Sequence, residues 1–245
     1  MKPETEPEPA AGNVTHARLL RENARLRADL LTVATRITHD LRTPLGGIVS
    51  TGELLKEILA EKAPDSTALT DSLFTSVDEM TRLIGQVRFI AKASADPRPK
   101  ERIKMETIVS GVLQRLESRI LKKSATVTEP GSWPEVNGVA DWLEFIWWNF
   151  LANALQHAGE KPQIELSWRQ EKNGFRFQIC DNGGDVPVEV RTRLFQPFDS
   201  LHKPGSTYGL GLSVVQRLVD LQGGDCGYEP NPNGGACFFF ILPAT

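Results

Sequence analysis

The chain has 245 residues, of which 28 are basic and 31 acidic, a net charge of −3, and hydrophobic side chains at 40% of its positions. This length and apolar content suffice for two folded domains of about 100 to 200 residues. The near-neutral charge provides no broad attraction to nucleic acid or to an anionic membrane, so we expect no nucleic-acid partner.

The three cysteines, Cys180, Cys226 and Cys237, are scattered and show no Cys-x-x-Cys spacing. The pattern predicts neither a disulfide framework nor a zinc site, and it is typical of a reducing cytoplasm. No apolar run approaches the roughly 18 residues that cross a bilayer. The first residues, MKPETEPEPAAG, are acidic and rich in proline, unlike a signal peptide. We therefore expect a cytoplasmic protein without membrane insertion.

The N-terminal part of the chain is expected to be helical from Val14 onward. Residues 1–13 carry too few apolar side chains to offset the entropy of ordering, and disorder is expected there. Two series then recur every seven residues, namely Leu19, Leu26 and Val33, and Asn23, Leu30 and Ile37. This is the a/d pattern of a coiled coil, with Asn23 at a position that fixes register. One amphipathic helix lying on its own domain is the alternative.

Two long helices over residues 14–95 are expected to form a hairpin. The first runs to about Lys62, where Pro64 and the capping candidates Asp65 and Ser66 mark its end. The second keeps helical spacing until a polar stretch with two prolines, and residues 96–101 are expected to be a linker. A two-helix hairpin has too few faces to bury both apolar stripes. We therefore expect a homodimer in which two hairpins form a four-helix bundle.

Residues 102–245 show a mixed pattern that predicts an α/β two-layer sandwich. Helical spacing marks 105–121, 141–159 and 212–222, and the last of these ends at two glycines. Alternating segments at 163–170 and 175–181 flank a hairpin-like turn at Asn173-Gly174. The run ACFFFILP at 236–243 predicts a closing strand.

The stretch THDLRTPLGG, residues 38–47, carries the first candidate chemistry. His39 lies beside Asp40, and Thr43 follows four residues on, hence on the same helix face. Pro44 is expected to bend the helix near His39 and expose the imidazole. A neutral imidazole is a nucleophile for phosphorus, and an adjacent carboxylate can accept its ring proton or hold the tautomer that frees the other nitrogen. A solvated surface contact is the alternative for an isolated His–Asp pair.

This string resembles, position by position, the phosphoacceptor box of sensor histidine kinases, within their dimerisation and histidine-phosphotransfer domain. The resemblance implies that His39 is the phosphorylated residue and Asp40 its general base. It also implies that Thr43 serves when the kinase dephosphorylates its partner.

A phosphoacceptor needs a donor, and the second domain holds candidate nucleotide-binding stretches. In NFLANALQHA, Asn149 and Asn153 lie one turn apart on a helix, where their oxygens could bind Mg²⁺. In CDNGGDVP, Asp181 ends a strand before two glycines, where a carboxylate could bind a base amine. In YGLGLSVVQRL, glycines lead into a helix whose N-terminal amides could receive phosphate.

Taken in order with LFQPF (194–198), these stretches resemble the N, G1, F and G2 boxes of the ATP-binding domain that histidine kinases share with gyrase, Hsp90 and MutL ATPases. This is the Bergerat or GHKL-like fold. The resemblance covers roughly residues 34–243 and implies ATP and Mg²⁺ as cofactors. By position, it assigns magnesium ligation to Asn153, support of the phosphates or metal to Asn149, the adenine amine to Asp181, and the shape of the pocket to Gly183, Gly209 and Gly211.

Three positions depart from the family pattern. Asp185 replaces the second glycine of the G1 box, Thr207 replaces the first glycine of the G2 box, and Gln156 replaces a basic residue. Each loses backbone freedom or positive charge beside an anionic ligand. The candidates for compensation are Gly184 and Gly205, for the turns, and Lys203, for the charge.

The predicted function is therefore that of an ATP-dependent protein histidine kinase of a two-component system. By the resemblance, it autophosphorylates His39 and passes the phosphoryl group to an aspartate on the receiver domain of a response regulator, with phosphatase activity towards that partner. One alternative is a histidine phosphotransferase or phosphatase with a degenerate ATP pocket, and another is a non-catalytic, ATP-sensing dimeric scaffold. The stimulus is expected to arrive through the N-terminal helix, from a separate sensor protein, or from a further part of a longer chain.

Overall fold

A computed structural model describes residues 11–62, 67–95, 98–196 and 210–244. The chain forms two compact units, Met1–Pro97 and Arg98–Thr245. In the described part of the chain, no helix is both long enough and apolar enough to span a membrane.

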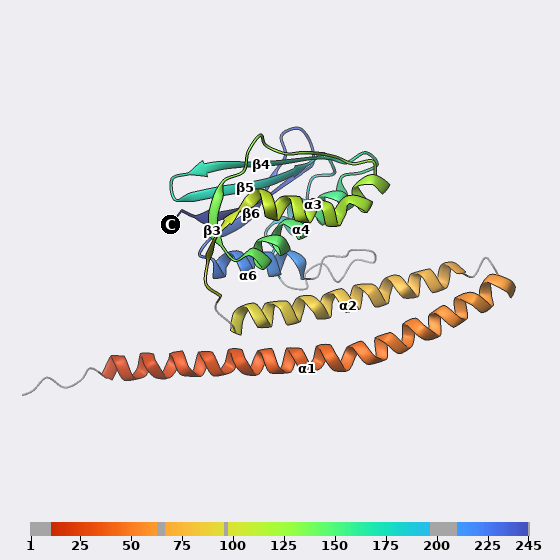
Figure 1. The fold of residues 1–245 in the computed structure, drawn as a ribbon, viewed down its shortest axis with the longest axis horizontal. Helices are drawn as coiled ribbons and strands as arrows, with labels where there is room; N and C mark the ends of the chain where they lie inside the picture. The colour runs from red at the N-terminus through yellow and green to blue at the C-terminus, as the bar shows by residue number, and fades with distance from the viewer. Residues whose placement is uncertain (1–10, 63–66, 96–97, 197–209, 245) are drawn as a thin grey trace, which may run out of the picture. The chain divides into compact units, whose positions relative to one another are not determined.

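The first unit is a hairpin of two long helices, α1 (Ala11–Lys62) and α2 (Thr67–Ala95) (Figure 1). Gly52 of α1 lies so close to α2 that a Cβ atom there would be 3.1 Å from the ring of Phe74. Residues 11–13 are helical, although disorder was expected there. Residues 1–10 and the expected turn residues 63–66 lie outside the described part.

Pro44 lies inside α1 and does not interrupt it. Figure 1 shows α1 as one continuous ribbon that curves along its C-terminal half. A proline in a helix interior removes one backbone hydrogen bond. The helix accommodates that loss without a break, so His39 and the residues beyond Pro44 belong to the same helix.

The second unit is built on a five-stranded mixed sheet in the order β2-β4-β5-β7-β6. The strands are β2 (Thr126–Thr128), β4 (Gln163–Glu171), β5 (Gly174–Asp181), β6 (Asp225–Pro230) and β7 (Ala236–Pro243). Only the β2–β4 pair is parallel. A separate antiparallel ladder pairs β1 (Glu101–Lys104) with β3 (Glu135–Gly138).

Three helices cover one face of this sheet: α3 (Met105–Lys122), α4 (Ala140–His157) and α6 (Gly211–Leu221) (Figure 1). A short helix, α5 (Val188–Arg191), follows β5. The core between the layers is aromatic. The ring of Trp147 on α4 lies 6.1 Å from Phe177 of β5 and 5.5 Å from Phe240 of β7, measured between ring centroids. The predicted combination of a helical hairpin and an α/β two-layer sandwich is confirmed.

The hairpin predicted near Asn173-Gly174 is also confirmed, but Gly174 serves a different purpose. The strands β4 and β5 are joined by Lys172 and Asn173, and Gly174 is already the first residue of β5. A Cβ atom at Gly174 would lie 2.0 Å from the backbone oxygen of Leu242 in β7. The glycine is therefore required by the close approach of the neighbouring strand.

The expectation that the cysteines form no disulfide was wrong. Cys180 on β5 and Cys237 on β7 are directly opposite each other in the antiparallel ladder and form a disulfide, while Cys226 is a free thiol. The paired residues are 57 positions apart. Only the strand register brings them together, and no spacing rule for cysteines contains that information.

Candidate functional site

His39 lies on the surface of α1, with 82% of its side chain exposed. Its Nδ1 atom is 3.2 Å from Oδ1 of Asp40, and the other oxygen of Asp40 is 3.9 Å from Nε of Arg36. A carboxylate only accepts hydrogen bonds, so the ring nitrogen facing it carries the hydrogen. In the neutral ring, this tautomer leaves the lone pair on Nε2. Thr43 is exposed one turn further along the helix.

The helix also carries a long exposed apolar stripe. Its members are Leu26, Leu30, Val33, Ile37, Leu41, Ile48 and Leu55. An α-helix turns about 100° per residue, and Leu30 and Ile48 lie nine residues before and after His39. Nine residues bring a side chain about 180° around the helix. His39 therefore points away from this stripe.

In the second unit, Asn149 and Asn153 lie one turn apart on α4. Asn149 is 3% exposed, and its amide nitrogen donates to the backbone oxygen of Phe145 at 2.9 Å. This bond fixes the carboxamide and directs its oxygen, the atom that a magnesium ion prefers, away from the helix carbonyl. Asn153 is half-buried, and Gln156 is exposed near the end of the same helix.

Asp181 is the last residue of β5 and is 3% exposed. Its Oδ1 atom accepts a 2.8 Å hydrogen bond from the backbone N–H of Gly183. Burial raises the pKa of the Asp181 carboxyl, and hydrogen bonds from the backbone N–H groups of Gly183 and Ala236 partly oppose that rise. A buried carboxyl fixed in this way is a rigid acceptor for an amine of a ligand.

Two glycines allow the chain to pass close to Asp181. A Cβ atom at Gly183 would lie 2.4 Å from the backbone oxygen of His157, at the end of α4. Gly235 has a φ of +98°, and a Cβ atom there would lie 2.0 Å from the backbone oxygen of Asp181. The side chain of Asn231 donates to that same oxygen at 2.8 Å. Neither Gly235 nor Asn231 was predicted as a site residue, although the Gly234-Gly235 pair before the last strand is visible in the sequence.

Asp185 is not a bare negative charge. Its carboxylate accepts hydrogen bonds from Nη2 of Arg191 at 2.6 Å and from the Tyr228 hydroxyl. The Tyr228 hydrogen bond is the main cause that lowers the pKa of Asp185. Arg191 also donates from Nε to the backbone oxygen of Val186 at 2.8 Å. This set, Asp185, Arg191 and Tyr228, neutralises the acid that replaces the family glycine.

Gly184 does not supply the turn that was expected of it. Its φ is not positive, and a Cβ atom at Gly184 would meet nothing within 4 Å. The compensation that the structure does contain at this position is the ion pair of Asp185 with Arg191.

Gly211 is the first residue of α6, and in the described part of the chain Leu210, at the N-cap, makes no side-chain hydrogen bond to the helix start. The first amides of a helix have no partner within the helix, so this end suits an anion. The other predicted residues of this region, Lys203, Gly205, Thr207 and Gly209, lie outside the described residues.

His157 ends α4 beside Gly183. Burial lowers its pKa, and the nearby charge of Lys123 lowers it further. A neutral imidazole at this position adds no positive charge to the site near neutral pH.

The described residues thus combine a surface histidine on a helical hairpin with a buried carboxylate and two helix asparagines on an α/β layer domain. The family model described as "His Kinase A (phospho-acceptor) domain" matches residues 29–96. The model described as "Histidine kinase-, DNA gyrase B-, and HSP90-like ATPase" matches residues 138–245. With both matches in this order, the chain belongs to the sensor histidine kinases.

Curated relatives agree with this assignment. Phytochrome-like protein Cph1 of Synechocystis sp. is 29% identical over 234 residues, which cover 93% of this chain and 31% of that protein. Sensor protein KdpD of Escherichia coli is 28% identical over 232 residues, which cover 93% of this chain and 25% of that protein. Sensor histidine kinase AruS of Pseudomonas aeruginosa is 30% identical over 221 residues, which cover 84% of this chain and 22% of that protein. The chain thus spans about a third or less of these relatives.

Solved structures share the fold. The crystal structure of full-length ShkA in complex with AMPPNP has a TM-score of 0.65 at 24% identity, covering 87% of this chain and 46% of ShkA. Histidine kinase ThkA, in its complex with the response regulator protein TrrA, has a TM-score of 0.64 at 20% identity, covering 92% of this chain and 66% of that chain.

Proposed function

We propose that this chain is the kinase core of a two-component system. In the proposal, a homodimer binds ATP with Mg²⁺ in its second unit and transfers the γ-phosphoryl group to Nε2 of His39. The phosphohistidine then passes the group to an aspartate of a response-regulator receiver domain. Because ATP is the donor, the core works in the cytoplasm.

The observation that carries the proposal is the exposed His39–Asp40 pair. With its Nδ1 atom at 3.2 Å from Asp40, the imidazole presents Nε2 as a nucleophile. Attack forms the Nε2–phosphorus bond and breaks the bond between that phosphorus and the bridging oxygen of ATP, and ADP leaves. Asp40 stabilises the ring as it becomes positive and can take its Nδ1 proton. Positioning and charge neutralisation provide most of the acceleration in such a transfer.

The second unit supplies acceptors and donors suited to ATP. The Asp181 carboxylate accepts from the adenine amine, and the uncapped start of α6 at Gly211 faces the phosphates. Gly183 keeps the end of β5 close to the end of α4, which supports a single site formed by Asp181 and the two α4 asparagines. The ion pair with Arg191 offsets the negative charge of Asp185 and so reduces its repulsion of phosphate groups near the G1 segment.

A magnesium ion fits this site through amide oxygens. Among the described residues, no group of three or more His, Cys, Asp or Glu side chains could hold a metal ion. Asn153 would hold the ion together with oxygens of the nucleotide, and Asn149 would support it. When bound, the ion neutralises charge on the phosphates.

The exposed apolar stripe on α1 supports the proposed dimer. A contiguous apolar strip from Leu26 to Ile48 is unusual on a free helix and is buried when a second hairpin packs against it. Because His39 points about 180° away from Leu30 and Ile48, burying the stripe leaves the imidazole exposed. A four-helix bundle and an accessible phosphoacceptor are therefore compatible.

The response-regulator step rests on the family and on exposed chemistry at the hairpin. ThkA was solved with the response regulator protein TrrA, and this chain shares the ThkA fold. For the reverse activity, Thr43 lies one turn from His39, where its hydroxyl could orient a water for hydrolysis of the regulator's phosphoaspartate.

The test is incubation with γ-labelled ATP and Mg²⁺. The proposal predicts protein-bound label that is acid-labile, is lost in His39→Gln, and persists in the control His16→Gln on the same helix. Label that survives His39→Gln overturns it. Binding of a non-hydrolysable ATP analogue, measured by calorimetry, separates the kinase from a phosphotransferase with a degenerate pocket, which binds no nucleotide. An ATP-sensing scaffold binds the analogue but acquires no label.

A further inference from the structure

We propose that Cys180 and Cys237 form a reversible thiol–disulfide exchange site that sets the nucleotide affinity of the second unit. The site takes low-molecular-weight disulfides and thiols of the glutathione type as its reactants. The inference rests on the proposed function for the role of Asp181 and for the reducing compartment, while the exchange steps themselves do not.

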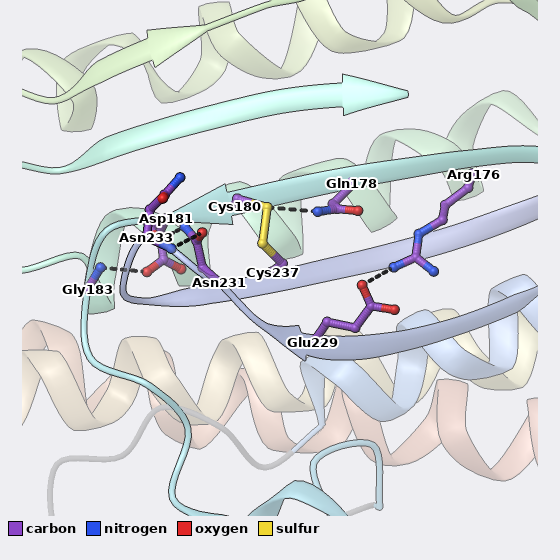
Figure 2. Close-up of a disulfide and its surroundings, with 9 residues drawn as sticks. All are labelled: Arg176, Gln178, Cys180, Asp181, Gly183, Glu229, Asn231, Asn233 and Cys237. Atoms are coloured by element: carbon purple, nitrogen blue, oxygen red, sulfur yellow. Dashed lines mark hydrogen bonds and ion pairs between the residues drawn. A yellow bond between two sulfur atoms is a disulfide. The ribbon is translucent and has the colours of Figure 1, made fainter. Parts of the chain in front are cut away.

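The location of the pair couples it to the nucleotide site. Cys180 and Cys237 are the last residues to face each other in the ladder between β5 and β7. The next residue of β5 is Asp181, and the residue before Cys237 is Ala236, whose N–H donates to the Asp181 carboxylate. Figure 2 shows the disulfide beside Asp181 at this end of the two strands.

The segment that leads into β7 also holds Asp181. The Asn231 side chain donates to the backbone oxygen of Asp181 at 2.8 Å (Figure 2). Within the segment, the backbone N–H of Asn231 donates to the oxygen of Gly235 at 3.1 Å, and that of Gly234 donates to the oxygen of Asn231 at 2.9 Å. The disulfide therefore joins the strand that ends in Asp181 to the turn that fixes Asp181. Breaking the bond removes the covalent link between these two parts.

The pair is accessible from one side. Cys180 lies three residues from Phe177, and Cys237 lies three residues from Phe240. The rings of Phe177 and Phe240 stack in the core with centroids 5.0 Å apart. Since side chains alternate along a strand, both sulfurs lie on the sheet face that points away from the helices. Cys180 is half-buried and accepts a hydrogen bond from the Gln178 amide at 2.9 Å, while Cys237 is 2% exposed. Exchange therefore begins at Cys180.

The chemistry balances with a small disulfide as oxidant. The Cys180 thiolate attacks one sulfur of RSSR, which forms a mixed disulfide and releases RS⁻. The Cys237 thiol then loses its proton and attacks the Cys180 sulfur, which closes the protein disulfide and releases the second RS⁻. In total, two protein thiols are oxidised and one RSSR is reduced to two RSH. Two RSH reverse the reaction by the same steps. A dithiol also reduces the protein disulfide: one of its thiolates attacks the Cys180 sulfur and releases the Cys237 thiolate, and its second thiol then attacks the mixed disulfide, which releases the Cys180 thiol and leaves the reagent as a cyclic disulfide.

Two further points bear on exchange at this pair: the first concerns its reversibility and the second its selectivity. On the proposed function, the protein takes its phosphoryl group from ATP and so works in a compartment where disulfides are usually transient or regulatory. Cys226, the remaining thiol, does not compete, because burial and the charges of Asp225 and Asp220 raise its pKa to about 12.

The test compares the native protein after equilibration with dithiothreitol and with oxidised glutathione. Alkylation followed by mass spectrometry is expected to count two additional thiols, on Cys180 and Cys237, after reduction without unfolding. Calorimetry with a non-hydrolysable ATP analogue is expected to give at least about fivefold tighter binding to the oxidised protein, the lower range of ordinary coupling between two sites. Because coupling is reciprocal, saturating analogue then lowers the reduction midpoint by about 20 mV for two electrons.

Variants separate the bond from its surroundings. Cys180→Ser and Cys237→Ser are expected to bind the analogue as the reduced protein does, in either buffer. The control Cys226→Ser keeps the redox response. Three results overturn the inference: a pair that resists dithiothreitol until the protein unfolds, two separate thiols after oxidation, or affinities that agree within a factor of two. If neither redox state binds the analogue, the regulatory role and the proposed ATP site both fail. Equal binding in the two states refutes the regulatory role alone.

Discussion

Gly183→Ala is predicted to damage the nucleotide site by separating β5 from α4. An alanine Cβ atom at this position would lie 2.4 Å from the backbone oxygen of His157 and 2.8 Å from Cα of Ala158. Backbone atoms cannot rotate away as a side chain can, so the end of α4 or the turn after Asp181 must move. The Asp181 carboxylate then loses the 2.8 Å hydrogen bond from residue 183 that positions it.

The substitution is expected to lower the free energy of unfolding by about 3 kcal/mol, the upper end of the usual range for overpacking. For a unit of this size, such a loss lowers Tm by about 10 °C. Gly184→Ala is the matched control, because its Cβ atom would meet nothing within 4 Å and Gly184 has no positive φ. That substitution is expected to be neutral or to stabilise by up to about 1 kcal/mol, since it restricts the unfolded chain.

Tryptophan fluorescence reports the unfolding of this unit alone, because all five tryptophans lie in it, between residues 133 and 168. Thermal melts and calorimetry with an ATP analogue on both variants test the prediction. The expected result is a lower Tm and weaker binding for Gly183→Ala, and near wild-type values for Gly184→Ala. Equal behaviour of the two variants would refute the assigned contact between Gly183 and the end of α4.

Three other predictions concern the same unit. Because burial raises the folded pKa of Asp181, the folded state binds a proton more tightly than the unfolded chain does, and stability falls as pH rises from about 4 through the raised value. Asp181→Asn is expected to flatten that dependence in urea midpoints and to weaken analogue binding about tenfold or more. Arg191→Ala is expected to weaken ATP binding, because it removes the cation that pairs with Asp185. Adenosine binding is expected to stay unchanged. Adding Asp185→Gly to Arg191→Ala is expected to restore the ATP affinity. Trp147→Ala, at a residue with no exposed surface, is expected to cost about 3 to 5 kcal/mol in urea unfolding.

Each of these predictions has a contradicting outcome. An unchanged pH dependence in Asp181→Asn would show that this carboxyl is not the group responsible. An ATP affinity that falls further in the double variant than in Arg191→Ala would mean that Asp185 contributes to binding. A Trp147→Ala cost no larger than that of the half-buried neighbour Trp148→Ala would contradict the aromatic core described above.

Long periodic elements of the fold could be predicted from the sequence, and short elements could not. The helices α1, α2, α3, α4 and α6 repeat apolar residues over several turns, and β4, β5 and β7 are eight or nine residues long. The strands β1, β2 and β3 have only three or four residues, too few to show an alternating pattern. Their pairing depends on tertiary contacts with other segments.

The site residues divide in the same way. Asn149, Asn153 and Asp181 were predicted because a motif places them at fixed positions relative to a helix or a strand end. Tyr228 is 43 positions from its partner Asp185, and Cys237 is 57 positions from Cys180. The cysteine pair depends on the register of β5 with β7. The Tyr228 contact also depends on the path of the chain after β5, and a single sequence specifies neither.

The identity of the phosphorylated nitrogen tests the central claim most directly. With Nδ1 of His39 facing Asp40, the account predicts that protein labelled with ATP and Mg²⁺ carries phosphate on Nε2 of His39. Phosphorus NMR of the labelled protein, compared with the two phosphohistidine isomers, gives the answer. Phosphate on Nδ1, or phosphate carried by any residue other than His39, would contradict the account.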